Sequence, residues 1–512
     1  MSIFKNLTPT NGFDNIDLNN ARQNNYAWAM SELGDYIYVG TSRNILINII
    51  SSINPNVHIP ALLMANPIDN RGEIWRYRKD GKLLWERVYQ STNIIENPVI
   101  AGFRYMITHR PFDGSPALYV ADTGERVKVL KSTNGVNWRV LEDTVLQGSS
   151  SRAMVTHKGK LYIATRDELD DNPVPLLYSS KDPEFYPWEP VILTTAEGFD
   201  PEKNPKGSIW NMAVFYNRIY VSTSYEDRIQ IWRTNGEEPR MNDWTLVVDG
   251  FENPLNTSTL AMGVFKDHLY VSGTKPLPLS YFIPLGFDLI RIDKNDNWET
   301  IVGGNLLFPL ASLIEEELNS LSHLGPGFNN PFNVYGWQIQ EYKDRLLIST
   351  FDDSINMEVI LTTLLENRAA LENLIGETVT NILIKIYMSV VEILTAINYP
   401  RGFDLYISED GVNFNAVFLN GLNNPFNYGG RILFVDSEND LYIGTANPFQ
   451  GCEVWKTNDI PDNALLPCDS NHYKELCKAM DLLAENFNII NENIPVILEL
   501  ISKNSCLKNL NG

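Results

Sequence analysis

The sequence predicts an all-β protein, a seven-bladed β-propeller closed by its N-terminal strand. Two observations lead to this prediction. One strand pattern recurs seven times along the 512 residues, and the last copy lacks a strand that the N-terminus can supply. We also expect α-helical insertions on one face of the ring and a helical tail after it.

The repeated pattern is a tyrosine or leucine between two aliphatic residues, followed by a small residue and often by threonine. A polar turn usually precedes each copy, and a third strand and a turn closed by an aromatic residue often follow it, which gives four strands per unit. Four-stranded units in this number are typical of a propeller. The copies are Ile37–Thr41, Leu118–Ala121, Leu161–Thr165, Ile219–Thr223, Leu269–Ser272, Leu346–Thr350 and Leu441–Thr445.

The seventh unit ends without a fourth strand, because Glu453–Lys456 is followed by Pro461 and helix-like sequence. Residues Ser2–Lys5 resemble the strand Ala416–Leu419 that ends the sixth unit. We therefore expect the N-terminal segment to pair with the last blade, which removes two sheet edges at once.

These patterns divide the chain into a propeller over residues 1–460 and a C-terminal helical extension over residues 461–512. Glycine, asparagine and proline mark the connections between blades and supply turn dihedrals there. The connections are Gly250–Pro254, Gly327–Pro331, Gly421–Pro425 and a looser Gly198–Pro201.

Long segments interrupt the repeat, all on the face where second strands end. The largest predicts a helical hairpin with a turn at Gly376, since its apolar residues follow helical spacing on both sides. Charged residues within it argue against a membrane span, so we expect a cap, with a partner-binding or membrane-surface hairpin as the alternative. The insertions span residues 42–72, 275–286, 305–325 and 352–402.

Acidic residues outnumber basic ones by 63 to 41, which gives a net charge of −22 without any basic run. Nucleic acid and anionic membranes are therefore disfavoured as partners. The start of the chain lacks a secretory pattern and predicts a cytoplasmic protein, with non-classical export or surface assembly left open. Few cysteines fit a reducing compartment, although Cys468, Cys477 and Cys506 share the tail and leave a disulfide open there.

Two turns, Ser132–Trp138 and Ser408–Phe414, resemble degenerate Asp-box turns of sialidase-like propellers, one residue shorter than the usual spacing. In those proteins the turns are structural and lie away from the catalytic face, so the resemblance implies a fold and not an activity. Stretches such as Asn447–Trp455 also make the chain similar to a group of uncharacterised bacterial propeller proteins. That resemblance implies no activity either.

One side chain from each blade is expected to line the channel, at a position two residues before the methionine of the first strand. Tryptophan and arginine side chains that converge there can stack on a sugar ring or clamp a carboxylate. Alternatively, they pack between blades and pair with nearby carboxylates. The positions are Trp28, Arg104, Arg152, Trp210, Leu260 and Trp337, with Arg431 close to the corresponding place.

Carboxylates follow several of the second strands, so we expect them to lie near the face that carries the insertions. They can neutralise the arginines, bind Ca²⁺, supply an acid–base pair, or simply be solvated. His109 and His157 occupy equivalent places but lack further Zn²⁺ ligands, so no metal or cofactor is expected, with Ca²⁺ left open. The carboxylates are Asp122, Asp167, Asp227, Asp352 and Asp353.

Three functional hypotheses remain, because propellers host binding, catalysis and scaffolding alike. The first is a protein that holds a small polar or glycan-like ligand at the capped channel mouth. The second is an enzyme, a glycoside hydrolase or lyase that uses two of the carboxylates. The third is a structural or assembly protein, a homo-oligomer formed through the helical insertions or the tail.

Overall fold

Strands account for 41% of the computed structural model and helices for 15%. The structure describes residues 3–53, 58–92, 101–111, 114–168, 170, 173–276, 284–304 and 319–466. The expected insertion over residues 305–325 and the helical extension over residues 461–512 lie mostly outside the described residues, as do Cys468, Cys477 and Cys506.

The described strands form consecutive antiparallel groups of four, each joined strand to strand along the chain. The first three groups are β2 (Asn24–Leu33), β3 (Tyr36–Arg43), β4 (Glu73–Arg78) and β5 (Glu86–Gln90); β6 (Gly102–His109), β7 (Ala117–Thr123), β8 (Val129–Ser132) and β9 (Arg139–Val140); and β10 (Ser150–His157), β11 (Lys160–Arg166), β12 (Leu176–Ser180) and β13 (Glu189–Pro190).

The later groups follow the same pattern. They are β14 (Ser208–Phe215), β15 (Arg218–Tyr225), β16 (Arg228–Thr234) and β17 (Trp244–Asp249); β18 (Ser258–Phe265), β19 (His268–Thr274), β20 (Asp288–Asp293) and β21 (Trp298–Val302); β22 (Asn333–Tyr342), β23 (Arg345–Asp352), β24 (Leu405–Ser408) and β25 (Asn415–Phe418); and β26 (Gly429–Val435), β27 (Leu441–Ala446), β28 (Val454–Thr457) with β1 (Lys5–Asn6).

Each copy of the repeated sequence pattern lies on the second strand of a group. Its central residue is buried, as with Tyr38, Tyr119 and Leu347, because the second strand lies between two others and between neighbouring groups. The period-2 alternation of a strand places flanking aliphatic residues on the opposite face, where they are buried as well. For this reason hydrophobic residues occupy consecutive positions in the pattern and do not alternate with polar ones.

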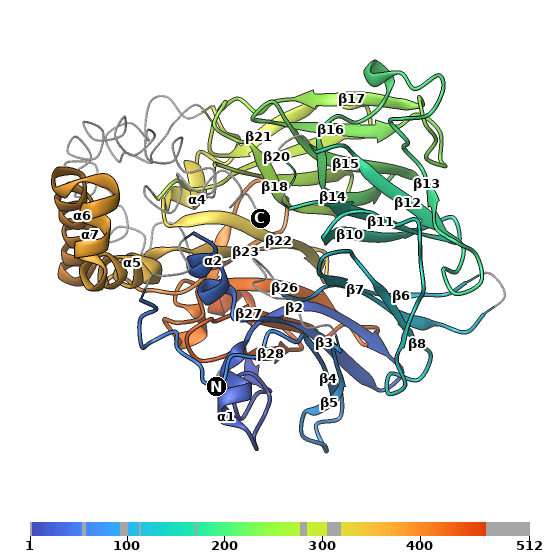
Figure 1. Cartoon of the computed structure of the whole chain (residues 1–512). Coiled ribbons are helices and arrows are strands. Elements are labelled where there is room, and N and C mark those ends of the chain that lie inside the picture. The colour runs from blue at the N-terminus through green and yellow to red at the C-terminus, as the bar shows by residue number, and fades with distance from the viewer. Residues whose placement is uncertain are drawn as a thin grey trace.

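The groups follow one another in chain order around a common centre (Figure 1). The first strand of each group contacts the first strand of the next, and β26 contacts β2. β1 pairs antiparallel with β28 in the register Lys5 to Lys456 and Asn6 to Trp455. The N-terminal strand therefore lies beside β28, and it shares only Lys5 with the segment Ser2–Lys5 picked out from the sequence.

Helices occur mainly in the insertions. α2 (Ile45–Ile53) lies in the insertion over residues 42–72, and α5 (Ser354–Glu366), α6 (Arg368–Ile375) and α7 (Glu377–Ala396) in that over residues 352–402. The expected turn at Gly376 is confirmed, with φ of 90° between α6 and α7. A break at Asn367, which the periodicity did not predict, separates α5 from α6. The shorter helices are α1 (Leu18–Gln23) and α4 (Pro326–Asn329), with 3₁₀ turns at Pro201–Lys203, Gly421–Asn423 and Asp462–Ala464.

The helical insertion packs against the strand groups and against other insertions. Leu383, Tyr387 and Leu394 of α7 share a buried cluster with Phe332 and with Leu285 of the neighbouring insertion. In a second cluster, Ile45 and Ile47 of α2 meet residues at the start of α5. Within the described part of the chain, no helix has both the length and the apolar character needed to cross a membrane.

The connections between groups carry a repeated hydrogen bond from an asparagine side chain at or just before the first strand to a buried carboxylate at or just before the third strand of the same group. We call this contact the Asn–carboxylate clasp. It also holds a backbone carbonyl of the connecting turn, which fits the turn role expected from the sequence. The pairs are Asn24 with Glu73 (2.8 Å), Asn256 with Asp288 (2.6 Å), Asn333 with Asp404 (2.8 Å) and Asn427 with Glu453 (2.7 Å).

The two turns that resemble Asp boxes share one geometry. Ser132 Oγ accepts a hydrogen bond from the Gly135 backbone at 2.8 Å, and Ser408 Oγ accepts one from Gly411 at the same distance. Both glycines have positive φ, and a Cβ at Gly135 would overlap the hydroxyl group of Tyr38 in the neighbouring group. Glycine is therefore required there for both conformation and space.

Candidate functional site

The first strand of each group contains a β-bulge at the position aligned from the sequence. The register shifts between Ala27 and Ala29, between Phe103 and Tyr105, and likewise around the other positions. A bulged residue is left out of the ladder and its side chain is re-aimed. The bulged residues are Trp28, Arg104, Arg152, Trp210, Trp337 and Arg431, with Leu260 and Ala261 together in β18.

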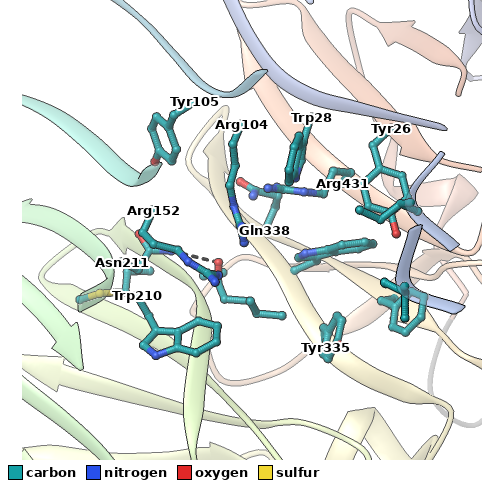
Figure 2. A pocket seen from close by; sticks show the side chains of 17 residues that line it. Tyr26, Trp28, Arg104, Tyr105, Arg152, Trp210, Asn211, Tyr335, Gln338 and Arg431 are labelled. Carbon is teal, nitrogen blue, oxygen red and sulfur yellow. Dashed lines mark hydrogen bonds between the residues drawn. The ribbon is translucent and has the colours of Figure 1, made fainter. Parts of the chain in front are cut away.

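All these residues line one cavity of about 120 Å³. Figure 2 shows the side chains of Arg104, Arg152 and Arg431 extending toward the same space. The structure thus brings together the six side chains that repeat alignment selected. This convergence follows from the bulges, because each places its side chain on the inner side of a first strand.

The arginines are held against the tryptophans of adjacent groups. The Arg104 guanidinium lies 5.2 Å from the Trp28 ring centre, that of Arg152 lies 4.3 Å from Trp210, and that of Arg431 lies 5.4 Å from Trp337. Such cation–π contacts are strongest when both partners are desolvated. The indoles therefore position the guanidinium groups, and one face of each indole is covered by a cation.

Glu168 joins three of the arginines near the cavity. It pairs with Arg152 Nη2, and its carboxylate oxygens lie 3.5 Å from Arg104 Nη1 and 3.6 Å from Arg166 Nη1. The backbone N–H of Glu168 donates to Ser149 Oγ at 2.9 Å, which fixes the residue after β11. We call Arg104, Arg152, Arg166, Arg431 and Glu168 the arginine cluster.

Positive charge exceeds negative charge in the arginine cluster by four guanidiniums to one carboxylate. Burial lowers the pKa of Arg104 and of Arg431 to about 10, so both remain charged at neutral pH. Burial alone would raise the pKa of Glu168, but the charges of Arg152, Arg166 and Arg104 outweigh it and hold that pKa below its ordinary value. Glu168 is therefore ionised, and it neutralises only one of the cations.

Several hydrogen-bond donors around the cavity are buried without a partner among the described residues. They are Nε and Nη1 of Arg152, Nε of Arg431 and Nε1 of Trp210. An unsatisfied buried donor costs about 1 to 3 kcal/mol, and more when it is charged. A bound group with acceptor oxygens would remove part of this cost.

The remaining wall of the cavity combines aliphatic residues with the polar side chains of Asn211 and Gln338 and with tyrosines. Leu260, Ala261 and Met262 of β18 contribute to it, and α2 adds Ile45 and Ile49 from the insertion over residues 42–72. α2 thus covers one side of the cavity, and Ile45 in turn shares a buried cluster with Ile355 in the first turn of α5. In Figure 1, α2 lies over the centre of the strand groups.

The five carboxylates selected from the sequence do not line this cavity, among the residues described. Asp167 and Asp227 are exposed. Asp122 is buried in β7, where its side chain accepts the backbone N–H of Lys128 at 2.7 Å, and burial raises its pKa to about 7. Asp352 and Asp353 are buried at the start of α5.

Sequence reasoning missed Glu168 although it selected the adjacent Asp167. The signal was the alternation of an extended chain, because Arg166 and Glu168 are two residues apart and face the same way. Asp167 therefore faces solvent, while Glu168 reaches the cations.

A second buried cluster has the opposite sign. We call Asp352, Asp353 and Asp404 the aspartate cluster. Asp352 accepts a hydrogen bond from the Tyr399 hydroxyl at 2.6 Å, and Asp404 accepts one from the Tyr406 hydroxyl at 3.0 Å. Among the described residues, no lysine or arginine forms an ion pair with any of the three.

Protons compensate for the missing cations in the aspartate cluster. Burial, and then the charge of Asp352, raise the pKa of Asp404 to about 8. Burial raises the pKa of Asp352 to about 6, and that of Asp353 rises well above its ordinary value for the same reason. The cluster therefore retains protons near neutral pH and supports the root of the helical insertion.

The histidines and a group of surface carboxylates have protein partners. His109 Nε2 lies 3.1 Å from the carbonyl of Lys181, and His157 Nε2 lies 2.6 Å from that of Glu237. In the described part of the chain, one set of three carboxylates lies within reach of a single ion, in the turn between β26 and β27, where Lys79 and Lys456 approach it. The set is Asp436, Glu438 and Asp440.

Comparison with known proteins assigns this chain to no family. No protein-family model matches the chain, and no curated protein matches it in sequence. Similar solved structures include the computationally designed Ika8 protein, with 7% identity over 85% of this chain and 96% of that chain and a TM-score of 0.39. The WD40 β-propeller domain of Doa1 has 10% identity over 77% of this chain and 88% of that chain, with a TM-score of 0.38.

An α-L-arabinofuranosidase from Clostridium thermocellum is also similar, with 11% identity over 49% of this chain and 82% of that chain and a TM-score of 0.28. Scores this low carry no argument about a ligand or an activity.

Proposed function

We propose that this chain is a seven-bladed β-propeller that binds a small anionic ligand in the cavity at its channel mouth. The observation that carries the proposal is the excess of buried positive charge at that cavity, with unused donors on Arg152 and Arg431. Residues 1–460 would form the propeller, and residues 461–512 the extension.

The strand pairings support the seven-bladed ring. Each first strand contacts the next, β26 contacts β2, and β1 completes the group formed by β26, β27 and β28. A ring of this kind leaves a central channel whose lining comes from the first strands. The bulged side chains would then meet at one end of the channel, beneath α2.

Electrostatics favours an anion over a neutral sugar. Burying an ion costs several kcal/mol unless it is paired, and Glu168 compensates only part of the arginine cluster. One face of each cavity indole already carries a guanidinium, which reduces its use for sugar stacking. The volume of about 120 Å³ also holds fewer atoms than a whole hexose molecule contains.

The other two hypotheses have less support. A glycoside hydrolase uses two carboxylates that flank the scissile bond, whereas Glu168 is held by three arginines and the five selected aspartates lie elsewhere. An assembly role for the helical insertion calls for an exposed apolar face. The apolar residues Leu383, Tyr387 and Leu394 are instead buried with Phe332.

Anion binding can be measured directly with acetate and sulfate as probes and with acetamide as the uncharged control. For a ligand of four non-hydrogen atoms the affinity ceiling is about 6 kcal/mol, so we expect dissociation constants between roughly 0.1 and 1 mM. Isothermal titration calorimetry gives the constants, and the fluorescence of Trp28, Trp210 and Trp337 reports the site.

The matched variant is Arg431→Met, because Arg431 lines the cavity without a described carboxylate partner. We expect it to weaken acetate binding by about tenfold, or 1.4 kcal/mol, with an unchanged circular dichroism spectrum. Arg228→Met, in an exposed turn, serves as the control and should bind as the parent does. Acetamide binding as tightly as acetate, or an Arg431→Met variant that binds normally, would contradict the proposal.

A further inference from the structure

The arginines and the aliphatic residues of β18 line different sides of the cavity, and the polar side chains of Asn211 and Gln338 belong to the two strands next to β18. In the order of contact, the first strands carry tryptophan in β2, arginine in β6 and β10, tryptophan in β14, leucine in β18, tryptophan in β22 and arginine in β26. The strand with Leu260 is therefore separated from every arginine-bearing first strand by one that carries Trp210 or Trp337. A ligand in the cavity meets cations on one side and hydrocarbon on the other.

The apolar side is enlarged by the form of its bulge. In β18 the register skips from Thr259 to Met262, so both Leu260 and Ala261 leave the ladder, whereas the bulge at Arg152 involves one residue. The carbonyl of Leu260 accepts a hydrogen bond from Asn211 Nδ2 at 2.9 Å. This bond occupies the polar backbone group exposed by the bulge, so the side chains of β18 present an apolar surface.

The cavity size limits how the two sides can be used together. A dry cavity of about 150 Å³ holds benzene, so a cavity of about 120 Å³ has room for roughly five or six non-hydrogen atoms. A phosphate or sulfate ion would use nearly all of that room and make no use of the apolar wall. A carboxylate group needs three atoms and leaves room for a short alkyl chain.

We infer that the ligand is a short-chain monocarboxylate of propionate or butyrate size. Its carboxylate accepts hydrogen bonds from the free donors of Arg152 and Arg431, and its alkyl tail lies against Leu260 and Met262. Planar guanidinium groups suit a planar carboxylate, since two N–H bonds can meet its two oxygens. The inference rests on the proposed anion-binding function and names the class of anion.

A series of acetate, propionate, butyrate and hexanoate, compared with inorganic phosphate, tests the inference by calorimetry. Each methylene added up to butyrate should tighten binding about threefold to fourfold, the equivalent of about 0.8 kcal/mol. Hexanoate exceeds the cavity and should bind more weakly than butyrate. Phosphate should bind more weakly than propionate.

The variant Leu260→Ser tests the tail contact. It should lose most of the gain in affinity from acetate to butyrate, measured as the ratio of the two dissociation constants. Leu246→Ser, at a partly exposed leucine of β17, is the matched control and should keep that gain. In case Leu260→Ser folds poorly, methyl-labelled methionine in the parent protein gives a second measurement, in which butyrate shifts the Met262 signal more than acetate does.

The outcomes separate this inference from the proposed function. If phosphate binds as tightly as propionate, or if affinity does not change with tail length, the monocarboxylate inference is wrong while anion binding stands, provided that Arg431→Met still weakens it. If no anion of the series binds, both fail. Tail-dependent affinity that Leu260→Ser abolishes supports both.

Discussion

The arginine cluster and the aspartate cluster each bury an excess of one sign of charge, but they handle it differently. In the arginine cluster, Arg104 and Arg431 keep their charge and line a cavity, and Arg152 and Arg431 have unused donors. In the aspartate cluster, Asp352 and Asp404 accept hydrogen bonds from tyrosine hydroxyls and take up protons instead. Buried charge therefore points to a ligand site only where it stays ionised and space remains beside it.

The physical reason is the difference in pKa between a carboxyl group and a guanidinium group. An aspartate can lose its charge when burial raises its pKa by a few units, whereas a guanidinium stays protonated at neutral pH even in a buried site. A surplus of arginine must be met by an anion, from the chain or from solution. The Asn–carboxylate clasp at Asp288 shows the balanced case, since Lys275 lies 2.7 Å from Asp288 and both are buried.

Among the substitutions that test this comparison, Glu168→Gln should have the largest effect on the free energy of unfolding. It removes the one carboxylate that Arg104, Arg152 and Arg166 share, and breaking a buried ion pair costs about 3 to 5 kcal/mol. Urea unfolding at pH 7 measures the loss in free energy of unfolding. Glu237→Gln, which disrupts an exposed pair with Lys158, should change little.

An added anion sharpens this test. At a propionate concentration of about 100 times its dissociation constant, binding to the folded state should stabilise the parent protein by about 2.7 kcal/mol. We expect the Glu168→Gln variant to gain at least as much, because it has one more uncompensated cation. A variant that unfolds like the parent, with or without propionate, would show that Glu168 does not balance the cluster.

Asp404→Asn should change the pH dependence of stability. Its pKa is raised to about 8 in the folded state, above the ordinary 3.8, so the folded protein binds the proton more tightly than the unfolded chain. This contribution to stability is full below about pH 4 and is lost as the pH rises to 8, at up to about 1.4 kcal/mol per pH unit.

Asparagine cannot ionise, so the free energy of unfolding of Asp404→Asn should decline less steeply between pH 5 and 8, with a residual slope from Asp352. Thermal or urea unfolding at several pH values measures this. Asp410→Asn is the control, because hydrogen bonds outweigh partial burial and lower the pKa of Asp410 to about 2. Its removal should lower stability at neutral pH but change the pH slope only in acid, below about pH 4. An unchanged slope in Asp404→Asn would mean that the aspartate cluster is ionised near neutral pH.

Trp28→Phe should have the smallest effect. The Arg104 guanidinium lies 5.2 Å from the centre of the Trp28 ring. A cation–π contact with tryptophan is worth about 0.5 to 2 kcal/mol, and phenylalanine retains a part of it. We expect propionate affinity to fall by about twofold to fivefold, measured by calorimetry. Trp298→Phe, outside the cavity, should leave the affinity unchanged.

Local patterns were the part of the fold that the sequence could predict. The copies of the repeat lie on second strands, because a hairpin pattern depends on residues that are neighbours in sequence. Alignment of the repeats then located Trp28, Arg152 and the other bulged residues that line the cavity. The pairing of each arginine with a tryptophan of the adjacent group depends on bulge geometry, which the alignment does not contain.

The carboxylates show the limit of such reasoning. Asp167 and Glu168 are adjacent and chemically alike, and only the direction of the chain after β11 decides which one meets the arginines. Asp404 was missed because its raised pKa comes from burial and from Asp352, and its side chain is held by Asn333; both residues are distant in sequence. Residues whose role is set by tertiary neighbours cannot be ranked from sequence patterns alone.

The bulges at the cavity also bear on how such a protein evolves. A bulged residue is left out of the hydrogen-bonded ladder, so strand pairing does not depend on its side chain. Tryptophan, arginine and leucine accordingly occupy equivalent positions on the first strands. Gene duplication can therefore copy the blade while mutation exchanges the residue that it presents. Selectivity for a ligand can diversify one blade at a time, and a library randomised at these positions is a direct route to designed receptors for other small molecules.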